Sequence, residues 1–330
     1  MTDPAETAGT AGTVLVTSRS FGTGRVDVAG HLDAAGLRPV RGSVVHDLAE
    51  LRPLLADAVG WIAGTAAVTG EHLDAAPRLR VVARYGVGVD AVDVAAASRR
   101  GVVVTNTPAA NTTAVADLTL ALALAVLRNV VEASGAVRAG DWSVRRGREL
   151  GALTVGLVGL GRIGLAVAAR LRGFGCTVVG HDPYADADVG RTVGVEPVAL
   201  RDLLMTADLV SLHCPGGTVR IDDGALARVR PGAVLVNTAR ADLVDETAVA
   251  RALRDGRLGG YGADMVAGEA GSDSPVLAPD LADRVVVTPH LGAQTVDAVD
   301  RMGAGAVRAV VDVLAGRTPE SAVVSTGAVR

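Results

Sequence analysis

The chain has 330 residues, which is enough for two domains of ordinary size, and 49% of them are hydrophobic while only 2% are aromatic. Its formal net charge of −4 gives no support to binding of nucleic acid or of an anionic membrane, and no apolar run reaches the roughly 18 residues that suggest a membrane span. The chain contains no lysine, which excludes Schiff-base and P-loop chemistry because both depend on a lysine amine.

The two cysteines, Cys176 and Cys214, lie far apart in the sequence, with no CxxC pair and no histidines at ligand spacing. We therefore expect neither a disulfide framework nor a metal site, and a reducing cytoplasm fits this composition. Residues 1–13 are small, polar and slightly acidic, and they lack the basic and apolar regions of a signal peptide, so we expect a frayed tail.

In the first third of the chain, short β-branched runs alternate with glycine-rich or helix-like sequence. Strands are predicted there at residues 14–17, 61–63, 80–83 and 102–105. The stretch 112–130 that follows has a helical pattern and is apolar on nearly all sides, so it should be buried between domains or subunits. The polar, arginine-rich segment 138–148 is expected to be a surface connector.

A second series of strands and helices begins at Leu153. Its later strands are predicted at residues 178–180, 209–212, 234–237, 260–263 and 285–288, and a closing helix is predicted at 296–314. Alternation of this kind predicts an α/β fold in which crossover helices connect parallel strands.

Three glycines in the segment 154–164 have the spacing of a dinucleotide-binding turn. Gly159, Gly161 and Gly164 directly follow an apolar strand and precede a helical run. In such a turn the first glycine allows the tight bend, the second lets the backbone approach a pyrophosphate, and the third lets helix and strand pack closely. The helix N-terminus adds the positive end of its dipole, so the segment predicts a site for a dinucleotide.

An acidic residue follows the next strand of this series. The strand at 176–180 ends just before Asp182, which lies 18 residues beyond Gly164. An acid at this distance accepts hydrogen bonds from the adenosine ribose hydroxyls and repels a 2′-phosphate, so we predict NAD rather than NADP. The plainer alternative is that Asp182 only opens a turn with Pro183.

Three later strands are each followed by residues suited to carbonyl chemistry. Arg240 follows the strand at 234–236, Asp264 ends the strand at 260–263 with Glu269 five residues later, and His290 follows the last strand. Ligands of open α/β sheets bind at the carboxyl ends of the strands, so we expect these groups to converge near a nicotinamide.

Each of these residue types has a part in exchanging hydride with a 2-hydroxy or 2-keto acid. Arginine offers a planar, permanently charged fork for the substrate carboxylate. Histidine gives or takes the carbonyl proton near neutral pH, and a carboxylate beside it fixes the orientation of the ring. Taken singly, Arg240 could be a surface arginine, Glu269 a solvated loop acid and His290 a loop cap.

The chain resembles the D-isomer-specific 2-hydroxyacid dehydrogenases over nearly its whole length, and phosphoglycerate dehydrogenase-like members in particular. The resemblance rests on the glycine turn and on four further motifs: Ala83-Arg-Tyr-Gly-Val-Gly-Val-Asp90, Leu212-His-Cys-Pro215, Val236-Asn-Thr-Ala-Arg240 and Val287-Thr-Pro-His-Leu-Gly292. It implies an NAD-dependent enzyme acting on a small anionic 2-hydroxy or 2-keto acid, with Arg240, Glu269 and His290 as catalytic residues.

The resemblance also implies a set of binding residues. It assigns the nicotinamide carboxamide to Asp264 and the pyrophosphate to Arg162 and Ile163. Further residues along the cofactor are Thr107, Cys214, Pro215, Thr238, Ala239 and Gly292. The substrate residues, besides Arg240, are Arg84, Tyr85, Gly86, Val87 and Gly88, of which Arg84 could contact a distal anionic group. A simple strand-to-helix turn is the alternative for the glycine loop 86–88.

The architecture implied by the resemblance is a pair of Rossmann-like domains with parallel sheets. The NAD-binding domain, residues 107–291, is inserted into a substrate domain made of residues 1–106 and 292–330. A homodimer formed through residues 112–148 is expected, and an additional C-terminal regulatory domain is not.

Three alternatives keep the same scaffold: an interaction protein and two enzymes with a different reaction. A co-repressor-like interaction protein would use NAD as a conformational ligand and would retain the same three catalytic residue types. Formate-oxidising relatives pair the histidine with glutamine where this chain has Glu269, and phosphite-oxidising relatives use a lysine that this chain lacks. The dehydrogenase is therefore the favoured prediction.

Overall fold

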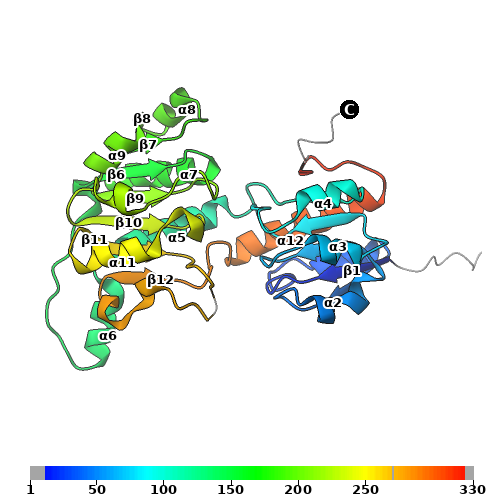
Figure 1. Cartoon of the computed structure of the whole chain (residues 1–330). Helices are drawn as coiled ribbons and strands as arrows, with labels where there is room; N and C mark the ends of the chain where they lie inside the picture. Colours follow the sequence, from blue (N-terminus) through cyan, green and yellow to red (C-terminus); the bar gives the residue numbers. More distant parts are fainter. Residues whose placement is uncertain (1–11, 270, 324–330) are drawn as a thin grey trace, which may run out of the picture. The chain divides into compact units, whose positions relative to one another are not determined.

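The structure is a computed structural model in which residues 12–269 and 271–323 are described. Most of the tail predicted at residues 1–13 lies outside the described residues. The chain divides into two compact units, unit 1 with residues 1–111 and 293–330, and unit 2 with residues 112–292. Each unit contains a parallel sheet accompanied by helices (Figure 1), which confirms the predicted α/β class with two parallel sheets.

The boundaries of the two units differ by a few residues from those of the predicted domains. Residues 107–111, predicted with the dinucleotide-binding domain, fall in unit 1, while Gly292, predicted with the other domain, falls in unit 2. Hydrogen bonds account for both shifts. The Thr107 amide donates to the Gly86 carbonyl at 2.9 Å, and the Gly292 amide donates to the Asp264 carboxylate at 2.7 Å.

Unit 1 is built on five parallel strands in the order β2-β1-β3-β4-β5. The strands are β1 (Gly12–Val16), β2 (Leu37–Arg41), β3 (Ala58–Ala63), β4 (Val81–Arg84) and β5 (Val103–Thr105). The helices are α1 (Val28–Ala34), α2 (Leu48–Leu55), α3 (Gly70–Asp74), α4 (Val94–Arg99) and α12 (Val296–Leu314). The order reverses between β1 and β3, and the carboxyl ends of strands at such a switch point are the usual place for a ligand.

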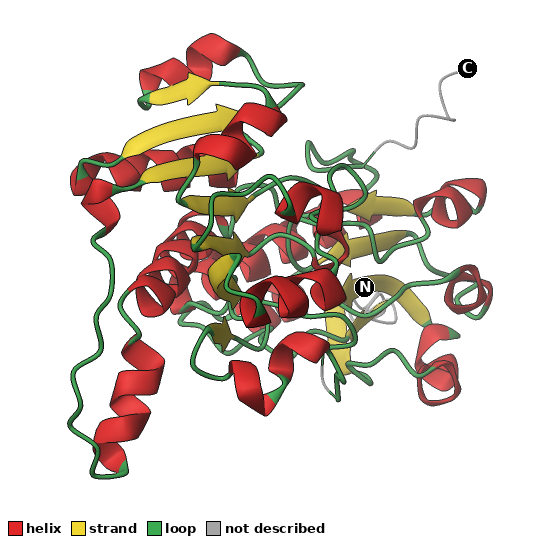
Figure 2. Cartoon of the chain, turned by 60° about the vertical axis from the view of Figure 1, so that its left-hand side comes forward, coloured by secondary structure: helices red, strands yellow, loops and turns green. Residues whose placement is uncertain are grey.

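Unit 2 is built on seven parallel strands in the order β12-β11-β10-β9-β6-β7-β8, with helices on both faces (Figures 1 and 2). The strands are β6 (Thr154–Val158), β7 (Thr177–His181), β8 (Val195–Pro197), β9 (Leu209–Leu212), β10 (Ala233–Asn237), β11 (Leu258–Ala263) and β12 (Val285–Val287). The α-helices are α5 (Thr112–Leu127), α6 (Val130–Arg138), α7 (Arg162–Leu171), α8 (Ala187–Thr192), α9 (Leu200–Thr206), α10 (Asp223–Leu226) and α11 (Glu246–Arg254).

The sheet of unit 2 brings the ends of distant strands together. Asn237 at the end of β10 pairs with Leu212 of β9 and Ala263 of β11, and Ala263 pairs with Val287 of β12. The strand order reverses between β6 and β9. The residues that follow β6, β9, β10, β11 and β12 therefore all emerge at one edge of the sheet, which includes the switch point.

The predicted helix at 112–130 is two helices. α5 ends at Leu127, Asn129 takes a left-handed backbone with φ of 52°, and α6 begins at Val130 at an angle of 61° to α5. α5 packs against α7, β10 and β11 within unit 2, whereas α6 has no buried residue and projects from the sheet with the following loop (Figures 1 and 2). In the described part of the chain no single helix is long and apolar enough to cross a membrane. The bent pair of α5 and α6 reaches that length and apolar composition only when the two helices are taken together.

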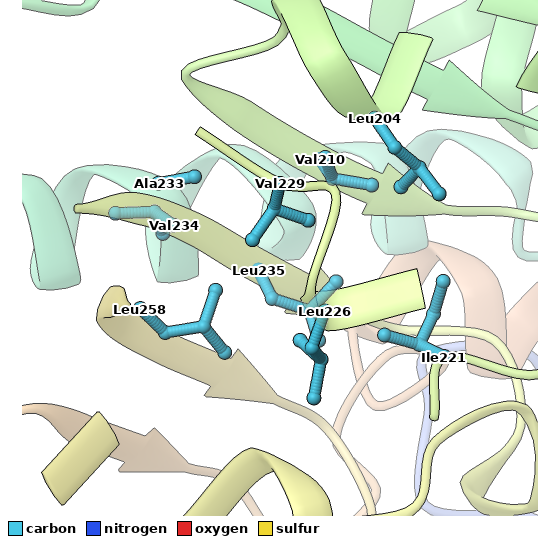
Figure 3. Close-up of a pocket in the computed structure, with 9 residues that line it drawn as sticks. All are labelled: Leu204, Val210, Ile221, Leu226, Val229, Ala233, Val234, Leu235 and Leu258. Atoms are coloured by element: carbon cyan, nitrogen blue, oxygen red, sulfur yellow. The ribbon is translucent and has the colours of Figure 1, made fainter. Parts of the chain in front are cut away.

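A small cavity lies in the core of unit 2, away from the sheet edge described above. Its walls come from β9, β10 and β11 and from the segments around α9 and α10 (Figure 3). The nine lining residues are apolar: Leu204, Val210, Ile221, Leu226, Val229, Ala233, Val234, Leu235 and Leu258. A cavity without a polar group offers no catalytic chemistry, whereas the polar and titratable side chains lie at the strand ends.

Candidate active site

The glycine turn connects β6 to α7, and two of its glycines are required by the protein itself. Gly159 has φ of 98°, and a Cβ there would come within 2.7 Å of the Cys214 amide nitrogen. A Cβ at Gly164 would come within 2.1 Å of the Gly159 carbonyl oxygen. Helix and turn therefore pack at a distance that only glycine permits.

Gly161 differs from the other two glycines. It precedes α7 without a side-chain cap, its φ of −69° suits any residue, and a Cβ there would meet no atom within 4 Å. Protein packing therefore gives no reason for glycine at this position. Open space above the amides that begin a helix is what a pyrophosphate needs, so the turn fits a dinucleotide.

The residues that flank the turn lie at the start of α7 and just after β9. Arg162 is exposed and Ile163 half-buried at the start of α7, while Cys214 is half-buried and Pro215 exposed just beyond β9. They stand at the switch point between β6 and β9, where the residues next to a bound pyrophosphate are expected.

Asp182 follows β7, beside the glycine turn. One carboxylate oxygen accepts from the Leu160 amide at 2.8 Å, and the other accepts from the amides of Tyr184 and Ala185 at 2.9 and 3.2 Å. The turn-opening arrangement therefore exists, and the same carboxylate also contacts the turn between β6 and α7. Three backbone donors fix its position at the edge of the predicted dinucleotide site.

His213 follows β9 and lies against the glycine turn. Its Nε2 lies 2.9 Å from the Ser211 hydroxyl, while its Nδ1 is enclosed without a hydrogen-bond partner among the described residues. Desolvation of the ring lowers the pKa of His213 to about 4. The ring is therefore neutral at neutral pH.

This burial predicts a stability that depends on pH. The unfolded chain takes up the proton near the ordinary pKa of 6.5 and the folded chain only near 4, so protonation favours unfolding. Stability is complete above about pH 6.5 and falls as the pH drops toward 4, by at most about 3 kcal/mol for this residue. Urea midpoints measured by circular dichroism at pH 7.5 and 5.0 should therefore differ less in His213→Gln than in the wild type. The exposed His31→Gln is the control, and an equal pH effect in all three proteins would contradict the prediction.

Asp264 directly follows β11 and holds the loop that follows β12. Only 1% of it is exposed, and it accepts from the Thr288 hydroxyl at 2.6 Å and from the amides of Leu291 and Gly292 at 2.7 Å each. Burial raises the pKa of Asp264 in spite of these donors. Its own carbonyl accepts from the His290 amide at 2.7 Å, so Asp264 fixes the backbone that carries the imidazole.

His290 and Glu269 form a hydrogen-bonded pair at the same sheet edge. The Nδ1 of His290 lies 2.8 Å from Oε1 of Glu269, and their side chains are 35% and 46% exposed. Both residues have left-handed backbones, with φ of 56° and 41°. Such conformations cost about 1–3 kcal/mol each and persist only where the surroundings hold them, which is common in active sites. The contact leaves Nε2 of the imidazole facing away from the acid.

Arg240 follows the neighbouring strand, β10, in a turn shaped by Asn237. The Asn237 amide group donates to the Arg240 carbonyl at 2.7 Å, and its oxygen accepts from the Ala239 amide at 3.0 Å. The guanidinium donates to the Ala239 carbonyl at 2.6 Å. Thr238 in the same turn is buried, with its hydroxyl 2.8 Å from that of Thr119 on α5. The turn therefore presents a half-buried guanidinium at the sheet edge.

The loop 84–88 lies in unit 1 at the end of β4. Gly86 has φ of 140°, and its amide donates to the Thr107 hydroxyl at 3.1 Å. The Val87 carbonyl accepts from the Asn106 side chain at 2.7 Å. Gly88 is half-buried, and Arg84 is buried with its guanidinium against the Tyr85 carbonyl.

Tyr85 and Thr107 are engaged within unit 1. The Tyr85 hydroxyl donates to the Val299 carbonyl of α12 at 3.0 Å, and burial raises the pKa of this side chain to about 12. Thr107 braces Gly86 through both its backbone and its hydroxyl. Any contact of Tyr85 with a substrate would therefore involve its backbone.

Three supporting residues were not singled out by sequence reasoning: Asn237, Thr288 and Glu246. Asn237 and Thr288 lie inside the sequence motifs 236–240 and 287–292, directly at predicted strand ends. Their position could therefore have marked them as supporting residues. Glu246, which contacts the segment around Glu269, follows an acidic residue at a helix start and offered no such signal.

Comparison with known proteins identifies the family. Residues 120–292, just over half of the chain, match the family described as D-isomer specific 2-hydroxyacid dehydrogenase, NAD binding domain. The chain belongs to the D-isomer-specific 2-hydroxyacid dehydrogenase family and contains its NAD-binding domain. The predicted family and the predicted cofactor, NAD, are thereby confirmed.

Individual relatives agree with this assignment. A D-3-phosphoglycerate dehydrogenase of Mycobacterium leprae is 45% identical over 267 residues, which make up 79% of this chain and 50% of that protein. The crystal structure of the TT0316 protein from Thermus thermophilus is similar with a TM-score of 0.85 and 40% identity, over 94% of this chain and 100% of that one. D-lactate dehydrogenase from Aquifex aeolicus, complexed with NAD and lactic acid, is similar with a TM-score of 0.82 and 26% identity, over 92% and 96% of the two chains. The chain spans about half the length of the curated relatives it matches.

Proposed function

We propose that this chain is an NAD-dependent oxidoreductase that moves hydride between the nicotinamide and a small D-2-hydroxy acid or 2-keto acid. The observation that carries the proposal is the 2.8 Å pair of His290 and Glu269, placed at the sheet edge that also holds the glycine turn. A titratable ring held by an acid beside a dinucleotide site is suited to moving the proton that accompanies hydride transfer.

The proposed roles of the three catalytic residues follow from their chemistry. His290 donates a proton to the carbonyl oxygen in the direction of reduction and accepts it in the direction of oxidation. Glu269 orients the ring through Nδ1, which directs Nε2 toward the substrate. Arg240 binds the substrate carboxylate with its planar fork. When bound, the nicotinamide supplies or accepts the hydride at the substrate carbon.

The binding residues are proposed on the same basis. We assign the pyrophosphate to the amides of Gly161, Arg162 and Ile163, and the nicotinamide carboxamide to Asp264. Further cofactor contacts are proposed for Thr107, Cys214, Pro215, Thr238, Ala239 and Gly292. For unit 1 we propose a substrate-binding role carried by the loop 84–88. The backbone amides of Val87 and Gly88 would be the donors, Gly86 would shape the loop while its own amide donates to Thr107, and Arg84 would contact a distal anionic group.

We extend the proposal to a homodimer in the cytoplasm. α6 has no buried residue, and the loop after it exposes Trp142 by 79% and Val144 by 97%. Apolar side chains gathered on a projecting segment favour contact with another chain, and a second copy is the occupant proposed here. Sedimentation equilibrium of the full chain measures the oligomeric state directly.

The proposed reaction is tested with a panel of 2-keto acids. Oxidation of NADH is followed by its absorbance with 3-phosphohydroxypyruvate, glyoxylate, hydroxypyruvate and pyruvate. We expect turnover with at least one of them. The highest kcat/KM with the phosphorylated acid would agree with the name of the relative that is 45% identical, a D-3-phosphoglycerate dehydrogenase. Tight NADH binding without turnover of any acid would instead favour the co-repressor-like alternative.

The preference for NADH is expected to depend on Asp182. In Asp182→Asn the negative charge that repels a 2′-phosphate is lost, so the ratio of kcat/KM for NADH to that for NADPH should fall at least about tenfold, or 1.4 kcal/mol. Steady-state kinetics with both cofactors measures this ratio. Asp186→Asn removes an exposed charge four residues away and should leave it unchanged. An unchanged ratio in both variants would argue against the role of Asp182.

A further inference from the structure

Glu246 is a buried acid next to the loop that carries Glu269. It is the first residue of α11 and only 8% exposed. The loop in question, here called the Glu269 loop, comprises the described residues 267–269 and 271–274. One carboxylate oxygen of Glu246 accepts from the Ala267 amide at 2.8 Å, and the other accepts from the Ser274 hydroxyl. A single side chain thus holds both ends of the Glu269 loop.

The surroundings of Glu246 explain how a buried carboxylate is tolerated. Burial of a charge is costly unless both oxygens find donors, and here each oxygen has one. The N-terminus of α11, nine residues long, adds the positive end of a helix dipole. An apolar residue at this position would avoid the cost of burial, so holding the loop is the function that accounts for the acid.

Hydrogen bonds inside the loop determine its shape, whereas the contacts of Glu246 attach it to α11. The Glu269 amide donates to the Val266 carbonyl at 3.1 Å, and the Ser272 amide donates to the Glu269 carbonyl at 3.0 Å. The Ser272 hydroxyl donates to the Ala267 carbonyl at 2.6 Å. These bonds close a turn around Glu269, whose left-handed backbone needs outside support. Glu246 supplies that support from α11.

We propose that Glu246 is a positioning residue for the Glu269–His290 pair, acting by anchoring both ends of the Glu269 loop to α11. The inference rests on the proposed function, because it assigns to Glu246 an effect on proton transfer through Glu269. Glu246 itself contacts neither His290 nor any proposed cofactor residue through the hydrogen bonds described above.

The test is a double-mutant cycle between Glu246 and Glu269 in the full-length chain. Glu246→Ala should lower kcat about 10- to 100-fold, since small displacements of catalytic groups have effects of that size, and should change the affinity for NADH little. In the background of Glu269→Gln, the same change should lower kcat no further, because the group it positions is already disabled. Glu246→Gln should restore most of the activity, since its oxygen can accept from Ala267 and its amide can donate to the Ser274 hydroxyl.

Asp245→Ala serves as the matched control for loss of stability. Asp245 caps the same helix by accepting from the Ala248 amide at 3.0 Å, so its removal lowers Tm without touching the Glu269 loop. We expect kcat to remain near the wild-type value in this variant. Hydrogen exchange of the amides in the Glu269 loop should become faster in Glu246→Ala and stay unchanged in Asp245→Ala.

Two results would overturn the inference. Effects of Glu246→Ala and Glu269→Gln that multiply independently would show that Glu246 acts through something other than Glu269. Equal losses of kcat in Glu246→Ala and Asp245→Ala would show that stability alone is responsible. Failure of the proposed function is distinguishable from both, because the wild type would then turn over no 2-keto acid while hydrogen exchange still reported whether Glu246 holds the loop.

Discussion

Replacing His290 with alanine is expected to lower kcat by about 10²–10⁴-fold, the usual contribution of a general acid or base. The imidazole is the titratable ring at the carboxyl edge of β12, and Glu269 fixes it through Nδ1 at 2.8 Å. Without it the carbonyl oxygen must take its proton from water. Binding of NADH should change little, because the glycine turn and Asp182 belong to other strands. Stopped-flow or steady-state absorbance gives kcat, and fluorescence titration gives the affinity for NADH.

Two further variants separate chemistry from backbone strain. His290 has φ of 56°, and asparagine tolerates a left-handed backbone better than alanine, so His290→Asn should fold as the wild type does and be equally inactive. His31→Ala makes the same substitution at an exposed histidine of α1 and should keep full activity. If His290→Asn retained more than about a tenth of the wild-type kcat, another group would have to supply the proton.

The sequence predicted those features that depend on local pattern. Strands such as β6, β9 and β10 are mostly apolar and buried, which makes them recognisable in the sequence, and the residues after them stand at the sheet edge by topology alone. The contact between Glu269 and His290 agrees with this placement, as does the position of Asp182 beside the glycine turn. Their catalytic and binding roles remain proposals for experiment.

The elements that the sequence did not predict are stabilised by their neighbours. β2 and β8 lie at the edges of their sheets, are three to five residues long and contain Pro39 and Pro197, so their pattern alone does not indicate strands. The break between α5 and α6 depends on one left-handed residue, Asn129, inside a run that otherwise favours one helix. Only the packing of unit 2 decides where α5 ends.

Supporting contacts across long sequence distances were equally hard to predict. Glu246 and Ser274 are 28 residues apart, and Asp264 and Gly292 are also 28 apart, so no local spacing links them. Acids at a helix start or a strand end are ordinary in sequence, and their function depends on the loop that the fold brings to them. Residues of this kind are the ones for which the structure adds most to the sequence.

A second large effect is expected at the glycine turn, where two substitutions should give different results. Gly161→Ala should weaken NADH binding at least about tenfold, or 1.4 kcal/mol, without lowering the Tm of the ligand-free protein. The added Cβ meets no protein atom within 4 Å and would occupy the space proposed for the pyrophosphate. Fluorescence titration with NADH and thermal melting without it measure the two quantities.

Gly164→Ala should instead lower both the affinity for NADH and the Tm of the ligand-free protein. Its Cβ would lie 2.1 Å from the Gly159 carbonyl oxygen, so α7 or the turn must move, and overpacking of this kind costs about 1–3 kcal/mol. Gly173→Ala is the matched control, since its Cβ meets nothing within 4 Å in a segment that follows the same helix, and it should change neither quantity. Wild-type affinity for NADH in Gly161→Ala would mean that the cofactor does not approach the backbone at this turn, and the assignment of the pyrophosphate to the start of α7 would be wrong.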